Sequence, residues 1–215
     1  MEFLHIINGE NTMKIKDFFI FRANTNTVTF QAHPINLGSN KNGTYDADSL
    51  AIGNYEGINF PVIFKQAYGK KLLNILGTGW GTLYLISDKM KTILEENKLT
   101  GWKTFPIKLY DKKGKEIFGY HGFSITGHCG PIDYKKAEII DRQRIPTGPI
   151  FKAYKGMHFG LDKWDGSDFF IPGKVLFFII TDKAATIIKT DKTLNASLIN
   201  CEDFEIDVDI VAIKD

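Results

Sequence analysis

The feature that most constrains this chain is a strand-sized apolar run followed at once by a capped amphipathic helix. Residues 82–86 form the apolar run, and Ser87 and Asp88 then supply a hydroxyl N-cap and an acid for the first helical turn. Apolar residues recur on one helical face at Met90, Ile93 and Leu94. Because glycine readily ends helices, this one is expected to stop at Leu99-Thr100-Gly101. A second strand should then run over residues 102–110, with Pro106 at an edge or a bulge.

The same order of signals returns 94 residues later, from Asp88 to Asp182. Residues 175–180 are the apolar run, Thr181 is the expected N-cap, and an apolar helical face follows at Ala184, Ala185, Ile187 and Ile188. Residues 198–213 are expected to form a closing strand. The two units resemble a degenerate repeat; alternatively, both simply reflect the preference of helices for Ser or Thr followed by Asp at their start.

These patterns predict an α+β fold, strand-rich, with a mainly antiparallel sheet and a few short helices. We expect a single domain over residues 1–215. The alternative is a strand-rich N-terminal region, residues 1–64, followed by an α+β region, residues 65–215. Asn8-Gly9, placed between two apolar runs, predicts an opening hairpin.

Charge and composition argue against nucleic acid and membrane partners. The 27 basic and 25 acidic residues leave a net charge of +2, and only Arg22, Arg142 and Arg144 are arginines. No apolar run reaches the roughly 18 residues that a membrane helix needs. The N-terminus shows no basic segment of a secretory signal, so we expect a cytoplasmic protein. Cys129 and Cys201 match no zinc or redox spacing and are expected to be free thiols, with a single disulfide as the alternative.

No catalytic or metal-binding motif is recognisable. The glycine-rich residues 77–81 precede a strand rather than a helix, which favours a turn over a phosphate loop. His121, His128 and Cys129 lie close in sequence, but an odd separation on a strand places the two histidines on opposite faces. We therefore expect no metal, no cofactor and no enzymatic activity.

The segment Trp164-Asp165-Gly166-Ser167-Asp168 is the densest polar motif. Its spacing does not fit an EF-hand loop, and Asp-Gly is typical of a tight turn. A bulky aromatic residue beside acids is a common anchor at protein interfaces. Trp164, Asp165 and Asp168 are therefore candidate partner-binding residues.

Acidic residues also alternate with apolar ones in the expected closing strand. Glu205, Asp207 and Asp209 would form a wholly acidic exposed face. Such charges can protect an edge strand from pairing with another chain. Alternatively, the three acids are a docking stripe for a basic partner.

Four segments resemble the myxobacterial-type immunity proteins of bacterial polymorphic toxin systems, a family known mainly as a domain of unknown function. They are Leu85-Ile86-Ser87-Asp88-Lys89, Leu99-Thr100-Gly101-Trp102, Phe105-Pro106-Ile107 and the Trp164 to Asp168 turn. The resemblance covers roughly residues 65 to 205. It implies a cytoplasmic protein that neutralises a toxin by direct protein–protein binding, and it implies no catalytic residue. The alternative function is an intracellular small-ligand-binding or scaffold module.

Overall fold

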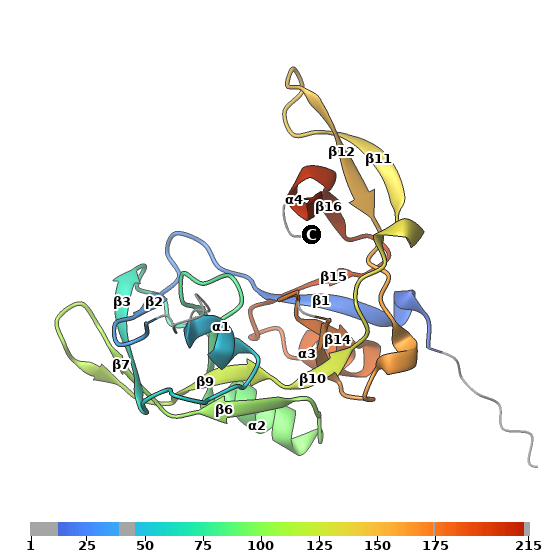
Figure 1. Ribbon diagram of the computed structural model, residues 1–215. Coiled ribbons are helices and arrows are strands. Elements are labelled where there is room, and N and C mark those ends of the chain that lie inside the picture. The colour runs from blue at the N-terminus through green and yellow to red at the C-terminus, as the bar shows by residue number, and fades with distance from the viewer. Residues whose placement is uncertain (1–12, 39–45, 174, 213–215) are drawn as a thin grey trace, which may run out of the picture.

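The structure is a computed structural model that describes residues 13–38, 46–173 and 175–212 (Figure 1). Over these residues it is strand-rich and mostly antiparallel, with four short α-helices, so the α+β prediction is confirmed. Within these ranges no helix is long and apolar enough to cross a membrane. The hairpin expected around Asn8-Gly9 lies outside the described residues.

Five strands form the body sheet in the order β10-β13-β14-β1-β15, antiparallel except for β10 and β13. Four strands form the central sheet in the order β4-β5-β9-β6, all antiparallel. The body strands are β1 (Phe18–Ala23), β10 (Gly127–Cys129), β13 (Phe169–Pro172), β14 (Ile179–Thr181) and β15 (Ala196–Asn200). The central strands are β4 (Ile75–Gly77), β5 (Tyr84–Ser87), β6 (Trp102–Phe105) and β9 (Tyr120–Ile125).

Both strand–helix–strand units are present and their topologies match, but the first helix ends at Glu96 rather than at residues 99–101, and the strand expected over residues 175–180 begins only at Ile179. Helix α2 (Asp88–Glu96) connects β5 to β6, and α3 (Asp182–Thr190) connects β14 to β15. The hydroxyls of Ser87 and Thr181 each accept a hydrogen bond from the third backbone N–H of their helix, at 3.2 and 3.3 Å. In each sheet one antiparallel strand lies between the two strands of the unit. That strand is β9 in the central sheet and β1, from the other end of the chain, in the body sheet.

The 94-residue offset holds beyond the two helices. The starts of β4 and β13, of α2 and α3, and of β6 and β15 are each separated by 94 positions, for example Ile75 and Phe169. The two helices also lie next to each other, since the Lys89 ammonium is 2.8 Å from the Asp191 carboxylate. The repeat inferred from the sequence therefore corresponds to two equivalent structural units.

Pro106 marks where the chain leaves the central sheet for another one. The predicted strand 102–110 is two strands, because a proline nitrogen cannot donate to a ladder. The second of them belongs to an outer sheet with the order β2-β3-β7-β8. Helix α1 (Asp46–Ala51) contacts β9 of the central sheet, where the Leu50 carbonyl accepts from the Ser124 hydroxyl (Figure 1). The outer strands are β2 (Gln31–Pro34), β3 (Val62–Tyr68), β7 (Ile107–Tyr110) and β8 (Glu116–Ile117).

A three-stranded sheet projects from the body (Figure 1). Its order is β11-β12-β16, formed by β11 (Glu138–Gln143), β12 (Ile150–Lys155) and β16 (Glu205–Asp207). Residues 138–155 form the long hairpin of this sheet and are called the arm below. Helix α4 (Val208–Ala212) and three 3-10 turns, η1 (Ile15–Asp17), η2 (Tyr134–Lys136) and η3 (Leu161–Lys163), complete the described elements.

The prediction of one closing strand over residues 198–213 is wrong. Strand β15 ends at Asn200, whose side-chain oxygen accepts from the Glu202 N–H at 2.9 Å and whose carbonyl accepts from the Asp203 N–H at 3.0 Å. An asparagine that bonds the backbone two residues ahead stabilises a tight turn. The turn sends the chain into the arm sheet, and the acids expected on one strand face are divided between β16 and α4.

The core consists of three clusters of buried apolar side chains. One fills the space between the body sheet, the central sheet and helices α2 and α3, around Phe21, Phe123 and Phe169. A second lies between the central and outer sheets and α1, around Phe64, Leu85 and Phe105. The third covers the other face of the body sheet, around Phe18, Phe170 and Cys201.

Candidate protein-binding surface

The turn from Trp164 to Asp168 is bonded into the body of the protein. The Asp165 carboxylate accepts from the backbone N–H of His128 and of Ser167, both at 3.0 Å, and lies 3.0 Å from the His128 ring nitrogen Nδ1. Burial acts to raise the pKa of Asp165, but the hydrogen bonds from Ser167 and His128 outweigh it and hold this pKa below its usual value. The carboxylate of Asp165 therefore serves to close the turn.

Asp168 joins the two structural units. It is only 7% exposed, and its carboxylate accepts from the Thr100 N–H at 3.0 Å and from the Thr181 hydroxyl at 3.0 Å. The Lys183 ammonium is 3.2 Å away. Thr100 lies in the loop after α2, and Thr181 is the N-cap of α3. The segments Leu99 to Trp102 and Trp164 to Asp168 thus meet at one buried junction.

Trp164 is partly buried against aromatic rings. Its ring centroid is 5.4 Å from that of Phe18 in an edge-to-face arrangement and 5.7 Å from that of Phe170. Its Nε1–H donates to the Ser167 carbonyl at 3.1 Å. Trp164 therefore packs and hydrogen-bonds within the body of the protein.

The acids of the C-terminal segment lie elsewhere, beside the arm. Glu205 forms a two-pronged ion pair with Arg142, and Asp207 pairs with Arg144. Both arginines come from the arm, 63 residues earlier in the chain. Asp209 is exposed on α4. The candidate residues therefore fall into two groups, one in the body and one on the arm sheet and the helix α4 that follows it.

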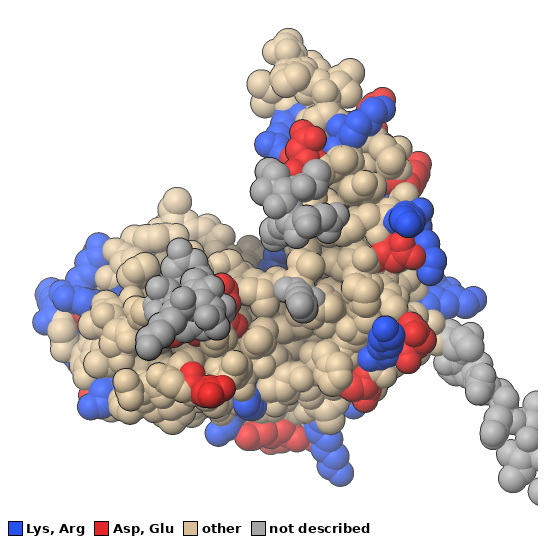
Figure 2. Space-filling model, in the orientation of Figure 1, with Lys and Arg blue, Asp and Glu red and all other residues tan. Residues whose placement is uncertain are grey.

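The arm carries three highly exposed isoleucines. Ile139, Ile145 and Ile150 are 60%, 60% and 67% exposed. Ile139 and Ile150 point to the same face of the hairpin, because Ile139 is opposite Tyr154 and Gln143 is opposite Ile150 in the register. Ile145 begins the tip turn, in which the Gly148 N–H donates to its carbonyl at 2.9 Å. Figure 2 shows a tip without charged residues, standing clear of the body.

The arm's charged side chains are largely paired within the chain. Besides the two arginine pairs, the Lys152 ammonium lies 2.6 Å from the Asp141 carboxylate. The arginine side chains lie on one face of the arm sheet together with Phe151, and the Arg144 guanidinium stacks 4.8 Å from that ring. The apolar tip is thus held on a braced hairpin.

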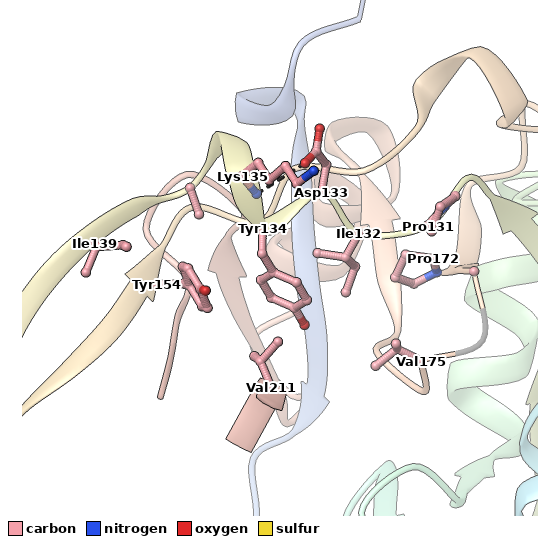
Figure 3. Close-up of a pocket in the computed structure, with 12 residues that line it drawn as sticks. Pro131, Ile132, Asp133, Tyr134, Lys135, Ile139, Tyr154, Pro172, Val175 and Val211 are labelled. Atoms are coloured by element: carbon pink, nitrogen blue, oxygen red, sulfur yellow. Dashed lines mark hydrogen bonds between the residues drawn. The ribbon is translucent and has the colours of Figure 1, made fainter. Parts of the chain in front are cut away.

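At its root the arm forms a groove with the body, with a volume of about 1040 Å³. The rings of Tyr134 and Tyr154 are in contact, with centroids 5.1 Å apart and planes tilted by 37°. Figure 3 shows Tyr134 between Tyr154 on the arm and Ile132 and Val175 on the body side, with Val211 of α4 below. The lining is mainly apolar, with Asp133 and Lys135 at one side.

The two histidines bond different carboxylates, whereas the two cysteines belong to the same buried cluster. His121 Nε2 is 2.7 Å from an Asp88 oxygen, whereas His128 pairs with Asp165. Cys129 and Cys201 are buried free thiols, and burial raises the pKa of each to about 12. Among the residues that the structure describes, no three His, Cys, Asp or Glu side chains are grouped as metal ligands.

The exposed isoleucines of the arm were not identified from the sequence. Two signals could have found them. Arg142 and Arg144 are two of only three arginines, and residues 145–150 (Ile-Pro-Thr-Gly-Pro-Ile) combine a turn with apolar residues. No family model matches this chain, and no curated protein matches it.

Proposed function

We propose that this protein is a cytoplasmic protein-binding module that neutralises a toxin domain by direct contact, and that the arm is its docking surface. The observation that carries the proposal is the contrast on the arm between paired charges and uncovered isoleucines. Large apolar side chains that cluster on a projection indicate a protein interface, whereas single exposed ones are ordinary. The resemblance of the sequence motifs to immunity proteins supplies the kind of partner.

The arm is suited to binding because it is braced before a partner arrives. Strand β16 pairs with β12, and the two arginine–carboxylate pairs tie β11 and the tip to β16. A surface that is already ordered loses less conformational entropy on binding. Anchoring side chains at the centre of an interface then contribute most of the affinity.

The experiment first tests the products of the genes beside this one for toxicity on expression in a host strain, and a toxic product is then the partner assayed. Growth rescue by co-expression tests neutralisation, and a titration of the purified toxin domain measures affinity. The double variant Ile145→Ser/Ile150→Ser should lose at least about 2 kcal/mol of binding energy with an unchanged melting temperature. The matched control is Ile35→Ser/Ile52→Ser, which alters isoleucines that are 59% and 43% exposed outside the arm.

Three results would contradict the proposal. Growth rescue could fail with the native chain, the arm variant could bind as tightly as the native chain, or the control could lose as much affinity as the arm variant. The first would reject toxin neutralisation, and the other two would reject the arm as its site.

The second candidate function is binding of a small apolar ligand, which the groove at the root of the arm favours. Its volume and its lining by two neighbouring tyrosines are typical of ligand sites. An apolar fluorescent dye tests this function: saturable binding of one dye molecule per chain, lost in Tyr154→Ser, would support it. If the native chain does not bind the dye, or if Tyr154→Ser binds it equally well, the groove is not a ligand site.

A further inference from the structure

The end of the molecule formed by β3 and the β7–β8 hairpin has a strong positive charge. Residues 62–72 and 107–118 carry seven exposed lysines and two acids, a net of five positive charges, whereas the whole chain has +2. The lysines are Lys65, Lys70, Lys71, Lys108, Lys112, Lys113 and Lys115. Basic side chains gather at the left of Figure 2, over β7 and the turn that follows it. Such a concentrated field attracts an oppositely charged partner.

These lysines are not neutralised within the described chain. None of the seven has a carboxylate within ion-pair distance among the described residues. The nearby acid Asp111 is used by the turn itself: its Oδ1 accepts from the N–H groups of Lys113 and Lys115, both at 2.8 Å. Gly114 supplies the positive φ of 84° that the turn needs. The hairpin therefore presents its ammonium groups on an ordered backbone.

Three of the lysines border a groove of about 490 Å³. Lys70 comes from the loop after β3, and Lys112 and Lys113 come from the hairpin turn. The Lys112 N–H donates to the Gln66 side chain at 3.0 Å, which fixes the turn against β3. Leu72 and Ile117 contribute apolar surface to the groove, and Leu72 is 43% exposed. The groove combines an apolar floor with a basic rim.

We propose that this groove binds an acidic, extended segment of a protein, independently of the arm. Carboxylates of the segment would pair with the lysines, while an aliphatic side chain between them covers Leu72 and Ile117. Proteins that bind single-stranded nucleic acid stack bases on exposed rings, and among the described residues that line this groove the only aromatic one is Phe30, which is 2% exposed. The described lining also lacks arginine, the side chain best suited to phosphates. The exposed rings of Tyr68 and Phe118 lie in the same two segments but outside the lining, so it is the groove itself that suits a carboxylate-rich peptide better than nucleic acid.

The test measures fluorescence anisotropy of labelled probes with the full-length protein. The probes are a twelve-residue peptide with Glu pairs flanking single Leu residues, the same peptide with Gln for Glu, and a twelve-nucleotide oligothymidine. The groove variant is Lys112→Glu/Lys113→Glu. The control variant, Lys163→Glu/Lys192→Glu, changes the net charge equally at exposed lysines outside the groove.

The acidic peptide should bind the native chain, and its affinity should fall as salt is raised from about 50 to 300 mM, because added ions screen exposed charges. The groove variant should bind the acidic peptide at least about tenfold more weakly than the native chain, and the control variant at most about twofold more weakly. Equal loss in both variants, equal binding of the Gln peptide, tighter binding of the oligothymidine, or no binding of the acidic peptide would each overturn the proposal. Because the arm is unchanged in these variants, they should still bind the partner proposed for the arm. Loss of acidic-peptide binding therefore tests the groove alone, and the arm variant tests the proposed function.

Discussion

Replacing Asp168 with alanine should weaken the junction between the two structural units. The carboxylate is buried and accepts from the Thr100 N–H and from the hydroxyls of Thr100 and Thr181. Its removal leaves these donors without their partner. It also loosens the N-cap of α3, because the Thr181 hydroxyl that caps the helix is oriented by Asp168.

The expected cost is about 3 kcal/mol of unfolding free energy. Hydrogen bonds to a charged group contribute about 1.5–3 kcal/mol each, and the energy regained by no longer burying a carboxylate offsets part of their sum. Lys183 adds little, since its side chain is 56% exposed and its ammonium can return to water. In a chain of this size such a loss lowers the melting temperature by roughly 6–12 °C.

Urea unfolding followed by tryptophan fluorescence, with a calorimetric melt, measures this effect. Asp162→Ala is the control, because it removes an exposed acid of the same region and should change stability by less than about 0.5 kcal/mol. If Asp168→Ala unfolds within about 1 kcal/mol of the native chain, the carboxylate does not hold the junction. A folded Asp168→Ala protein that no longer binds its partner would restore Asp168 as a binding residue.

Three further predictions concern other residues. Trp164→Ala should lose about 3 kcal/mol of stability in urea without weakening the partner binding proposed for the arm; the opposite pattern would make Trp164 an interface anchor. Cys129 and Cys201 should react with a thiol reagent at pH 8 only slowly in the folded state and rapidly in urea, since burial raises both pKa values to about 12; fast reaction in the folded state would contradict that burial. Hydrogen bonds from Lys89 and Thr193 lower the pKa of Asp191 from 3.8 to about 2, so its stabilising contribution is complete above pH 4 and lost as pH falls toward 2. Asp191→Asn should remove this part of the acid dependence, and an unchanged pH profile would refute it.

The elements that were predicted well depend on neighbours in sequence. Helices α2 and α3 follow from a cap, an acid and apolar spacing within about ten residues, and all of these act locally. The irregularity at Pro106 was also expected, because proline limits the ladder wherever it occurs, but it was placed within one strand, and the change of sheet was not predicted. The insertion of β9 between β5 and β6, and of β1 between β14 and β15, could not be predicted from the sequence. Strand β1 lies more than 150 residues before the strands that it pairs with.

The candidate site was harder to predict because its character depends on distant partners. Alternation in the C-terminal segment suggested an acidic face, but Arg142 and Arg144, which pair with Glu205 and Asp207, precede them by 63 residues. Asp168 and Thr100 are 68 residues apart. A pattern of residue types indicates exposure, and it does not indicate which charge will meet which. For the same reason, the isoleucines of the arm were recognisable as uncovered only in three dimensions.

The position of β1 sets the order in which the protein can form during synthesis. This strand is made early, yet it pairs with β14 and β15, so Phe18 must wait for Thr181 to leave the ribosome. At about 5–20 residues per second, the delay is roughly 10–30 s. The central sheet, whose strands all lie between residues 75 and 125, can assemble during that interval. A chain that stops before β14 would leave the edges of β1 unpaired and open to other strands, so truncated products of this gene should be prone to aggregate.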